Sequence, residues 1–393
     1  MDDGRRSSAP EPTAGGEGAA HLLSNGRYAV LVTPAGSGYS ALDGYALTRW
    51  TADPTRDADG FFLYIRDLGT GAVWSAGYQP TRHAPAHYEV RAEDGCVEIV
   101  RVDDNVEART RIFVAAQHDI EIRRVTLTNQ GAGTRRLELT SYAEVVLNTP
   151  AADAGHPAFS KLFVQTAYLP EHQALLAWRR LRSPDDRPLW LLHRLDVQGA
   201  GESELEYETD RVRFIGRGRT LAAPQALDPG ARLAGTTGNV LDSVLSLRRV
   251  VELAPGASAQ VTMALGAGET RGAVEALSTR LRNLAALEHA TAAPVQAKPV
   301  LGVPEVWLGG VRLTTSQEYA PLPGSNQAIP PPKQPSELSA PGVSEPLLFF
   351  NGFGGFSHDG REYVIRVAPG EDGRAKLPPL PWTNVVANEV AGF

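Results

Sequence analysis

Residues 60–80, GFFLYIRDLGTGAVWSAGYQP, decide the fold class of this chain. A run of aromatic and apolar residues leads to the turn Gly69-Thr70-Gly71, and a second such run follows. Two short strand-like runs separated by a few glycine-containing turn residues are typical of a β-hairpin. The stretch therefore predicts two antiparallel strands, and the flanking sequence repeats the pattern.

The same period-two alternation continues on both sides of this hairpin. Further strands are expected in residues 21–42, 108–131, 134–150, 158–181, 196–218 and 241–268. Many short strands at close spacing, with hardly a helix among them, are typical of a large antiparallel sandwich or barrel. The sequence thus predicts a mainly β protein whose body covers residues 21–268.

The regions outside this body differ in composition. Residues 1–20 are small, charged and rich in Pro and Gly, which predicts a disordered tail. Residues 269–292 carry Val and Leu at spacings of three and four, which predicts an amphipathic helix. Residues 293–345 contain a dense run of prolines that is typical of a linker. Residues 346–393 return to strand and turn chemistry, and we expect them to start a second, incomplete sandwich-like segment.

The overall composition limits the function classes. The chain has 393 residues, a formal net charge of −7 and a hydrophobic fraction of 42%. This supports a sizeable core and argues against a duplex nucleic-acid binder, which needs a concentrated basic face. The single cysteine excludes an intramolecular disulfide, and no apolar run is long enough to span a bilayer. We expect a soluble, cytoplasmic protein with no nucleic-acid partner, no direct membrane insertion and no cofactor.

The glycines of Gly36-Ser37-Gly38 leave three interpretations open: a phosphate cradle, a hairpin turn, or the lip of a sugar-binding surface. A phosphate-binding loop requires a helix after the glycines. Residues 39–50, YSALDGYALTRW, instead carry turn and aromatic residues, and no Lys-Ser or Lys-Thr follows. The pattern favours a tight turn between two strands, with Tyr39 beyond it facing a ligand or a partner.

Other reactive residue types form no recognisable catalytic motif. His83 and His87 have the i,i+4 spacing of a helical metal site, but Pro85 disfavours that helix, so we expect no metal. Cys96 follows a turn among carboxylates that oppose thiolate formation, so we expect an unreactive thiol. Glu144 lies within an apolar strand, which favours a buried, polar-paired carboxylate over a catalytic one.

Aromatic and arginine residues gather around the turns between residues 39 and 78. The group contains Tyr39, Tyr45, Arg49, Trp50, Tyr64, Arg66, Trp74 and Tyr78. Flat aromatic faces can stack on the C–H faces of sugars while Arg binds hydroxyls, but aromatic residues of a β-sandwich more often fill its core. The candidates for a face toward carbohydrate or toward an adjoining barrel domain are Tyr39, Arg49, Trp50, Trp74 and Tyr78.

Five motifs, in order along the chain, resemble the N-terminal supersandwich of the glycosyltransferase 36 group, also called glycoside hydrolase family 94. They are LSNGRYAVLVTPAGSGYSAL (23–42), ALTRWTADPTRD (46–57), YIRDLGTGAVWSAGYQP (64–80), ELTSYAEVVL (138–147) and HPAFSKLFVQT (156–166). Within the group, the chain is most similar to the carboxy-terminal phosphorylase-like region of cyclic β-1,2-glucan synthases. The resemblance implies a galactose-mutarotase-like β-supersandwich, normally followed by a helical linker and an (α/α)6 barrel.

The resemblance also implies a chemistry. In the family, inorganic phosphate attacks the anomeric carbon of a β-glucoside with inversion, and an Asp of the barrel, in a motif similar to Asp-Trp-Asn-Asp-Gly, acts as general acid. No such motif occurs in this sequence, and no barrel segment follows the predicted helix. We therefore expect a truncated or partial, non-catalytic module that associates with a β-glucan or glucooligosaccharide.

Two alternatives stay open. One is a component of an active inverting phosphorylase that acts on β-glucosides, which release of glucose 1-phosphate would reveal. The other is an assembly part that docks onto a separately encoded α/α-barrel domain or forms a homodimer.

Overall fold

The computed structural model describes residues 20–51, 57–93, 95–183, 186–199, 204–281, 346–350, 354–358 and 363–365. The chain divides into two compact units, Met1–Gln317 and Glu318–Phe393. In its described part, the first unit holds two large antiparallel sheets and the second holds one small one. The predicted mainly β architecture is confirmed.

The first sheet of the larger unit has nine strands. They are β1 (His21–Ser24), β2 (Tyr28–Val32), β3 (Gly38–Leu42), β4 (Tyr45–Thr48), β5 (Phe62–Asp67), β6 (Val73–Ser75), β11 (Arg135–Asn148), β15 (Glu206–Asp210) and β16 (Ser243–Leu253). The order is β1-β2-β3-β4-β11-β16-β15, with β5 paired to β11 and β6 paired to β5. Strand β11 joins the two parts of the sheet, because Leu139 pairs with Ile65 of β5 and Val145 pairs with Thr48 of β4.

The second sheet has eight strands in the order β12-β13-β14-β17-β10-β9-β8-β7. They are β7 (His87–Glu93), β8 (Cys96–Asp103), β9 (Val106–Val114), β10 (Ile120–Asn129), β12 (Val164–Leu169), β13 (Ala174–Arg179), β14 (Trp190–Gln198) and β17 (Ser258–Gly268). The predicted pair of strands in residues 108–131 is confirmed as β9 and β10, in register Val125 to Thr110.

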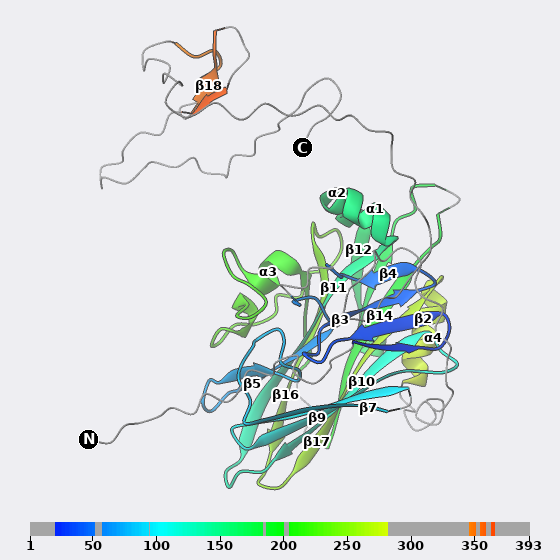
Figure 1. The fold of residues 1–393 in the computed structure, drawn as a ribbon, viewed down its shortest axis with the longest axis vertical. Coiled ribbons are helices and arrows are strands. Elements are labelled where there is room, and N and C mark those ends of the chain that lie inside the picture. Colours follow the sequence, from blue (N-terminus) through cyan, green and yellow to red (C-terminus); the bar gives the residue numbers. More distant parts are fainter. Residues whose placement is uncertain are drawn as a thin grey trace, which may run out of the picture. The chain divides into compact units, whose positions relative to one another are not determined.

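The main hydrophobic core lies between the two sheets, which Figure 1 shows as facing layers. Alternation assigns the faces of β10: Val125 and Leu127 belong to the core between the sheets, whereas Ile120 and Ile122 belong to a second apolar cluster. Val274 and Leu281, at helix α4 (Arg271–Arg280), join this second cluster. One face of the eight-stranded sheet therefore packs on the other sheet, and part of its opposite face packs on a helix.

The predicted turn at Gly36-Ser37-Gly38 is confirmed. Strands β2 and β3 pair antiparallel, and the Thr33 N–H donates to the Ser37 carbonyl at 2.8 Å. A strand rather than a helix follows the glycines, so the geometry of a phosphate cradle is not formed. Helix α4 lies within the predicted range 269–292, and residues after Leu281 are outside the described part.

Short helices interrupt two stretches that the sequence analysis assigned to strands. They are α1 (Pro150–Gly155), α2 (Pro157–Lys161) and α3 (Arg211–Ile215), with 3₁₀ turns η1 (Pro170–His172) and η2 (Gln225–Leu227). Thr149 caps α1 through Ala152 N–H at 3.3 Å, and Asp210 caps α3 through Val212 N–H at 2.9 Å. Pro is the first residue of both α1 and α2, a position that favours helix initiation.

The smaller unit contains a hairpin of β18 (Gly354–Phe356) and β19 (Tyr363–Ile365), in register Gly355 to Val364. The predicted tail, the proline-rich linker and most of the final segment lie outside the described residues. Among the helices that are described, none has both the length and the apolar character needed to cross a membrane.

Candidate functional site

Two of the predicted site residues, Tyr39 and Trp50, form an aromatic pair. Tyr39 lies on β3, and Trp50 follows the end of β4. Their ring centroids are 5.6 Å apart at an interplanar angle of 47°, and both side chains are half-buried. Burial raises the pKa of the Tyr39 hydroxyl, so it stays a neutral hydrogen-bonding group at physiological pH. The pair thus presents apolar surface together with a polar tip.

Arg49 fixes the backbone next to Trp50. Its Nε donates to Glu144 Oε1 at 2.6 Å, and its two terminal nitrogens bind both carboxylate oxygens of Asp153. Its own N–H donates to the Glu144 carbonyl at 3.0 Å. Burial lowers the pKa of Arg49, but Asp153 and Glu144 outweigh that effect and raise it overall. Arg49 is therefore a fixed anchor for the aromatic pair and not a free cation for a ligand.

This anchor belongs to an ionic cluster, which we define as Arg49, Glu144, Asp153, Lys161, Arg211 and Asp242. Glu144 binds Lys161 at 3.4 Å and Arg211 at 3.1 Å through opposite oxygens, in addition to Arg49. Asp242 binds Lys161 at 2.9 Å and Arg211 at 3.5 Å. Because α1, α2 and α3 each supply one member, the cluster connects three short helices to Glu144 of β11. Figure 1 shows α1 and α2 together at one end of the sandwich.

Two carboxylates beside the aromatic pair were not identified from the sequence. Asp59 Oδ2 accepts the Thr51 N–H at 2.5 Å, and its carbonyl accepts the Gly38 N–H at 2.8 Å. Asp57 accepts Thr33 Oγ1 at 3.3 Å, and burial raises the pKa of its carboxyl. These bonds connect the residues after β4 to the turn before Tyr39. No local motif marks them, because the contacts cross between separate turns.

The structure does not bring all five predicted residues together. Trp74 is 1% exposed and lies in the core between the sheets, so its side chain cannot contact a ligand at the surface. Tyr78 lies in the turn after β6, where its N–H donates to Tyr88 Oη at 3.2 Å, and Tyr88 in turn donates to the Pro34 carbonyl at 2.7 Å. Tyr39, Arg49 and Trp50 are adjacent through the contacts described above, and Tyr78 is connected through Tyr88 to Pro34 in the turn before Tyr39.

The histidines, the cysteine and the buried glutamate that the sequence analysis considered for metal binding or catalysis contact residues other than Tyr39 and Trp50. His83 and His87 do not lie on a helix; His87 begins strand β7, and His83 Nδ1 lies 3.1 Å from Asp103. In the described ranges, no three His, Cys, Asp or Glu side chains come together as a metal site. Burial, more than the neighbouring Glu98, raises the pKa of the Cys96 thiol. Glu144 is buried and polar-paired, as the sequence analysis favoured.

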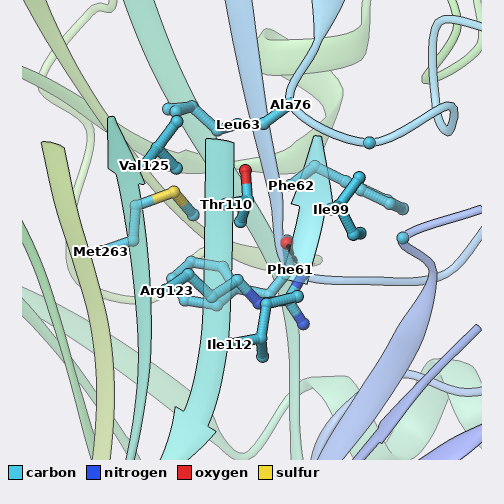
Figure 2. A pocket seen from close by; sticks show the side chains of 12 residues that line it. Phe61, Phe62, Leu63, Ala76, Ile99, Thr110, Ile112, Arg123, Val125 and Met263 are labelled. Atoms are coloured by element: carbon cyan, nitrogen blue, oxygen red, sulfur yellow. Dashed lines mark hydrogen bonds between the residues drawn. The ribbon is translucent and has the colours of Figure 1, made fainter. Parts of the chain in front are cut away.

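A small cavity of about 20 Å³ lies between the two sheets. Figure 2 shows Met263 and Val125 on one side, Ile99 on the other and Thr110 between them. Sites for small organic ligands usually have several hundred Å³. This interior space can hold a water molecule but not a glucosyl unit.

Comparison with known proteins identifies the family. The model of the glycosyl hydrolase 94 supersandwich domain matches residues 11–284. The cyclic beta-(1,2)-glucan synthase NdvB of Rhizobium meliloti (strain 1021) is 41% identical over 269 residues, which are 68% of this chain and 10% of the synthase. The N,N'-diacetylchitobiose phosphorylase of Vibrio proteolyticus is 24% identical over 280 residues, 70% of this chain and 33% of the phosphorylase.

A galactose mutarotase related enzyme from Lactobacillus acidophilus is similar in structure, with a TM-score of 0.34 and 12% identity over 64% of this chain and 99% of that enzyme. The chain spans about a tenth of the length of the glucan synthase and about a third of that of the phosphorylase. The family model covers the two sheets and helix α4 described above. This chain therefore belongs to the glycoside hydrolase 94 family, through its supersandwich domain.

Proposed function

We propose that this chain is a carbohydrate-associated, non-catalytic supersandwich module of a β-glucan phosphorylase or of a protein similar to cyclic β-1,2-glucan synthase. The observation that carries the proposal is the family match over residues 11–284, together with 41% identity to a relative named for cyclic β-(1,2)-glucan synthesis. The ligand we propose is a β-glucan or glucooligosaccharide, in the cytoplasm.

The surface around Tyr39 and Trp50 supports this ligand class. A half-buried aromatic pair can cover the C–H face of a glucosyl unit. At its edge, the Tyr39 hydroxyl can donate or accept a hydrogen bond, and the Asp59 carboxylate can accept one. Arg49, which precedes Trp50 in the chain, is itself fixed by its hydrogen bonds to Glu144 and Asp153. A preformed surface of this kind loses little conformational entropy when a sugar binds.

The absence of catalysis is proposed from the occupied carboxylates of the ionic cluster. A general acid must lie within hydrogen-bonding reach of the leaving-group oxygen. Both oxygens of Glu144 already bind cations, and both oxygens of Asp153 bind Arg49. Neither residue is placed to donate a proton to a glycosidic oxygen.

The alternative is a component of an active inverting phosphorylase. Asp57 favours it, because burial raises the pKa of this carboxyl and the residue contacts Thr33 and Ser37 in the turn before Tyr39. A raised carboxyl pKa is a property of catalytic acids, but buried structural carboxyls share it. Docking onto a separately encoded α/α-barrel domain, or homodimerisation, would be compatible with either role.

Two measurements on the purified chain decide between these functions. Calorimetric titration with linear β-1,2-glucooligosaccharides should show saturable binding, with cellooligosaccharides as the control for linkage. No heat up to millimolar concentrations would contradict the proposed ligand. Incubation with the same oligosaccharides and phosphate should release no glucose 1-phosphate above the background without protein. Turnover would establish the phosphorylase alternative.

A further inference from the structure

A surface patch beside α2 carries an unusual combination of exposed apolar side chains and arginines. Phe159, Leu162 and Leu181 are 48%, 44% and 47% exposed. Phe163 contacts Phe159, with the two ring centroids 5.1 Å apart in an edge-to-face arrangement. Contiguous exposed apolar groups on a folded protein commonly mark an interaction site.

Three arginines at the end of β13 cover the faces of these two rings. The Arg182 guanidinium lies 5.2 Å from the Phe159 centroid and 5.4 Å from the Phe163 centroid. Arg179 and Arg180 lie 5.2 Å and 5.8 Å from the Phe163 centroid. We call these three arginines, with Phe159, Leu162, Phe163 and Leu181, the arginine–phenylalanine patch. Its ring faces are occupied, so a sugar cannot stack on them without displacing a guanidinium.

The positive charge of the patch is only partly balanced by nearby carboxylates, since Asp186 and Asp153 act on Arg179 without forming an ion pair with it. Arg179 donates to the Ser160 carbonyl at 2.9 Å and Arg180 to the Leu162 carbonyl at 3.0 Å. Within the described residues, none of the three guanidinium groups forms an ion pair with a carboxylate. The neighbouring Asp186 is turned toward the backbone, where its Oδ2 accepts the N–H groups of Arg182 and Ser183 at 2.7 and 3.0 Å.

Burial and a neighbouring cation both act on Arg179. Burial, followed by the charge of Arg182, lowers the pKa of Arg179. An incoming carboxylate would relieve this repulsion, whereas a second copy of the patch would bring arginines against arginines. Charge complementarity thus favours an acidic occupant and disfavours a two-fold homodimer through this face.

We propose that the arginine–phenylalanine patch binds an acidic segment of another protein, whose carboxylates alternate with apolar side chains. The carboxylates would form bidentate hydrogen bonds with Arg180 and Arg182, and the apolar side chains would contact Leu162, Leu181 and the exposed edge of Phe159. Arginine and aromatic side chains are the residue types that dominate binding energy at protein interfaces. The inference does not depend on the proposed binding of glucan.

Fluorescence anisotropy with three labelled amphipathic peptides of equal length tests this inference on the full chain. One peptide alternates Glu with Leu on its two faces, one carries Lys with Leu, and one carries Glu with Ser. Only the Glu/Leu peptide should bind, and added salt should weaken its binding. Equal binding of the Lys/Leu peptide, or no binding of the Glu/Leu peptide, would overturn the proposal.

Matched variants locate the binding. The double variant Arg180→Gln and Arg182→Gln should weaken binding of the Glu/Leu peptide by about tenfold or more. Phe159→Ser should weaken it as well. Because the Phe159 side chain is exposed, this variant should fold as the wild type does, which circular dichroism checks. Arg232→Gln, an exposed arginine already paired with Glu204 and Glu206, should have no effect. Equal loss in the control would refute the assignment to the patch.

A lipid surface is the competing occupant, because exposed Phe and Leu beside arginines also suit an anionic membrane. Vesicles of phosphatidylcholine and phosphatidylglycerol in equal amounts should not co-sediment with the chain. Co-sedimentation that Phe159→Ser abolishes, without binding of the Glu/Leu peptide, would replace the protein partner by a membrane.

Discussion

Arg49 and Glu144 are joined twice, through side chain and backbone. The Arg49 Nε lies 2.6 Å from Glu144 Oε1, and the Arg49 N–H donates to the Glu144 carbonyl at 3.0 Å. The two side chains are only 16% and 8% exposed. This double contact connects the end of β4 to Glu144 of β11 and so positions Trp50, the next residue along the chain.

Arg49→Gln should destabilise the protein more than Glu144→Gln. Without Arg49, Asp153 loses its cation within the described residues, and an unpaired buried charge costs about 3 kcal/mol. Without the Glu144 charge, Arg49 still forms its ion pair with Asp153. Lys161 and Arg211 still form theirs with Asp242, so we expect the free energy of unfolding to fall by only about 1–2 kcal/mol. Urea unfolding of both variants measures the two free energies. Equal losses, or the opposite order, would show that Asp153 does not need Arg49.

Trp50→Ala should weaken binding of β-1,2-glucooligosaccharides. Loss of an aromatic contact of this kind removes about 0.5–1.5 kcal/mol, which corresponds to roughly a two- to tenfold higher Kd. Trp178→Ala serves as the control, because that half-buried tryptophan stacks on Trp190 instead of on Tyr39. Calorimetry of the two variants gives the comparison. An equal effect in both variants would argue against the Tyr39–Trp50 pair as the contact.

His193 should make the stability of the fold depend on pH. It is fully buried, its Nδ1 faces the Ala264 carbonyl at 3.1 Å, and its Nε2 faces Ser141 Oγ at 2.7 Å. A carbonyl only accepts, which assigns the proton to Nδ1 and makes Nε2 an acceptor for the Ser141 hydroxyl. Burial lowers the pKa of His193 from 6.5 to about 4.

Between these two pKa values the unfolded chain binds a proton that the folded chain does not. The contribution of neutral His193 to the free energy of unfolding is therefore complete above pH 6.5. It is lost as the pH falls toward 4, by about 3 kcal/mol in total. His193→Gln cannot titrate and should have a flatter profile in this window, although it is less stable at pH 7. Urea unfolding at several pH values checks this, with His87→Gln as the exposed control. An unchanged slope in His193→Gln would exclude His193 as the cause.

Gly38→Ala should disrupt the first hairpin, whereas Gly44→Ala should not. A Cβ at Gly38 would lie 1.7 Å from the Leu31 carbonyl oxygen, which forces β2 and β3 apart, and we expect a loss of more than about 4 kcal/mol. Gly44 also has a positive φ of 87° but nothing within 4 Å of a Cβ, so the strain alone costs about 1–2 kcal/mol. Thermal unfolding compares them. A mild Gly38→Ala variant would mean that the strands can separate there at low cost.

Trp74→Ala should unfold more easily than the wild type by about 3–5 kcal/mol, because it opens a large cavity between the sheets. Trp74→Phe should cost less, since the indole Nε1 has no hydrogen-bond partner among the described residues. Guanidinium unfolding of both variants provides the test. A Trp74→Ala variant with wild-type stability and reduced glucan binding would return this residue to the ligand surface.

Features set by neighbouring residues were predictable from the sequence. The hairpin of β5 and β6 follows from alternation around Gly69-Thr70-Gly71, and the β2–β3 turn follows from Gly36 and Gly38. Local signals also start helices α1 and α2, namely Thr149-Pro150 and Pro157, but the sequence analysis did not identify them.

The site was predictable only in part. Tyr39, Arg49 and Trp50 lie close together in the sequence, so their grouping needed little tertiary information. Trp74 was indistinguishable from Trp50 by residue type and by its position near a turn. Only the packing of one sheet on the other decided that Trp74 is buried and Trp50 is partly exposed.

By itself, the sequence determined the strands, their turns and the membership of the supersandwich family, because alternation and turn chemistry act over a few residues and the family motifs are contiguous. The tertiary structure alone decided the ionic cluster and the arginine–phenylalanine patch. Arg49 and Asp153, for example, are 104 residues apart. Charges at such separations meet only when strand pairing brings them together, and no local pattern records which of them will meet.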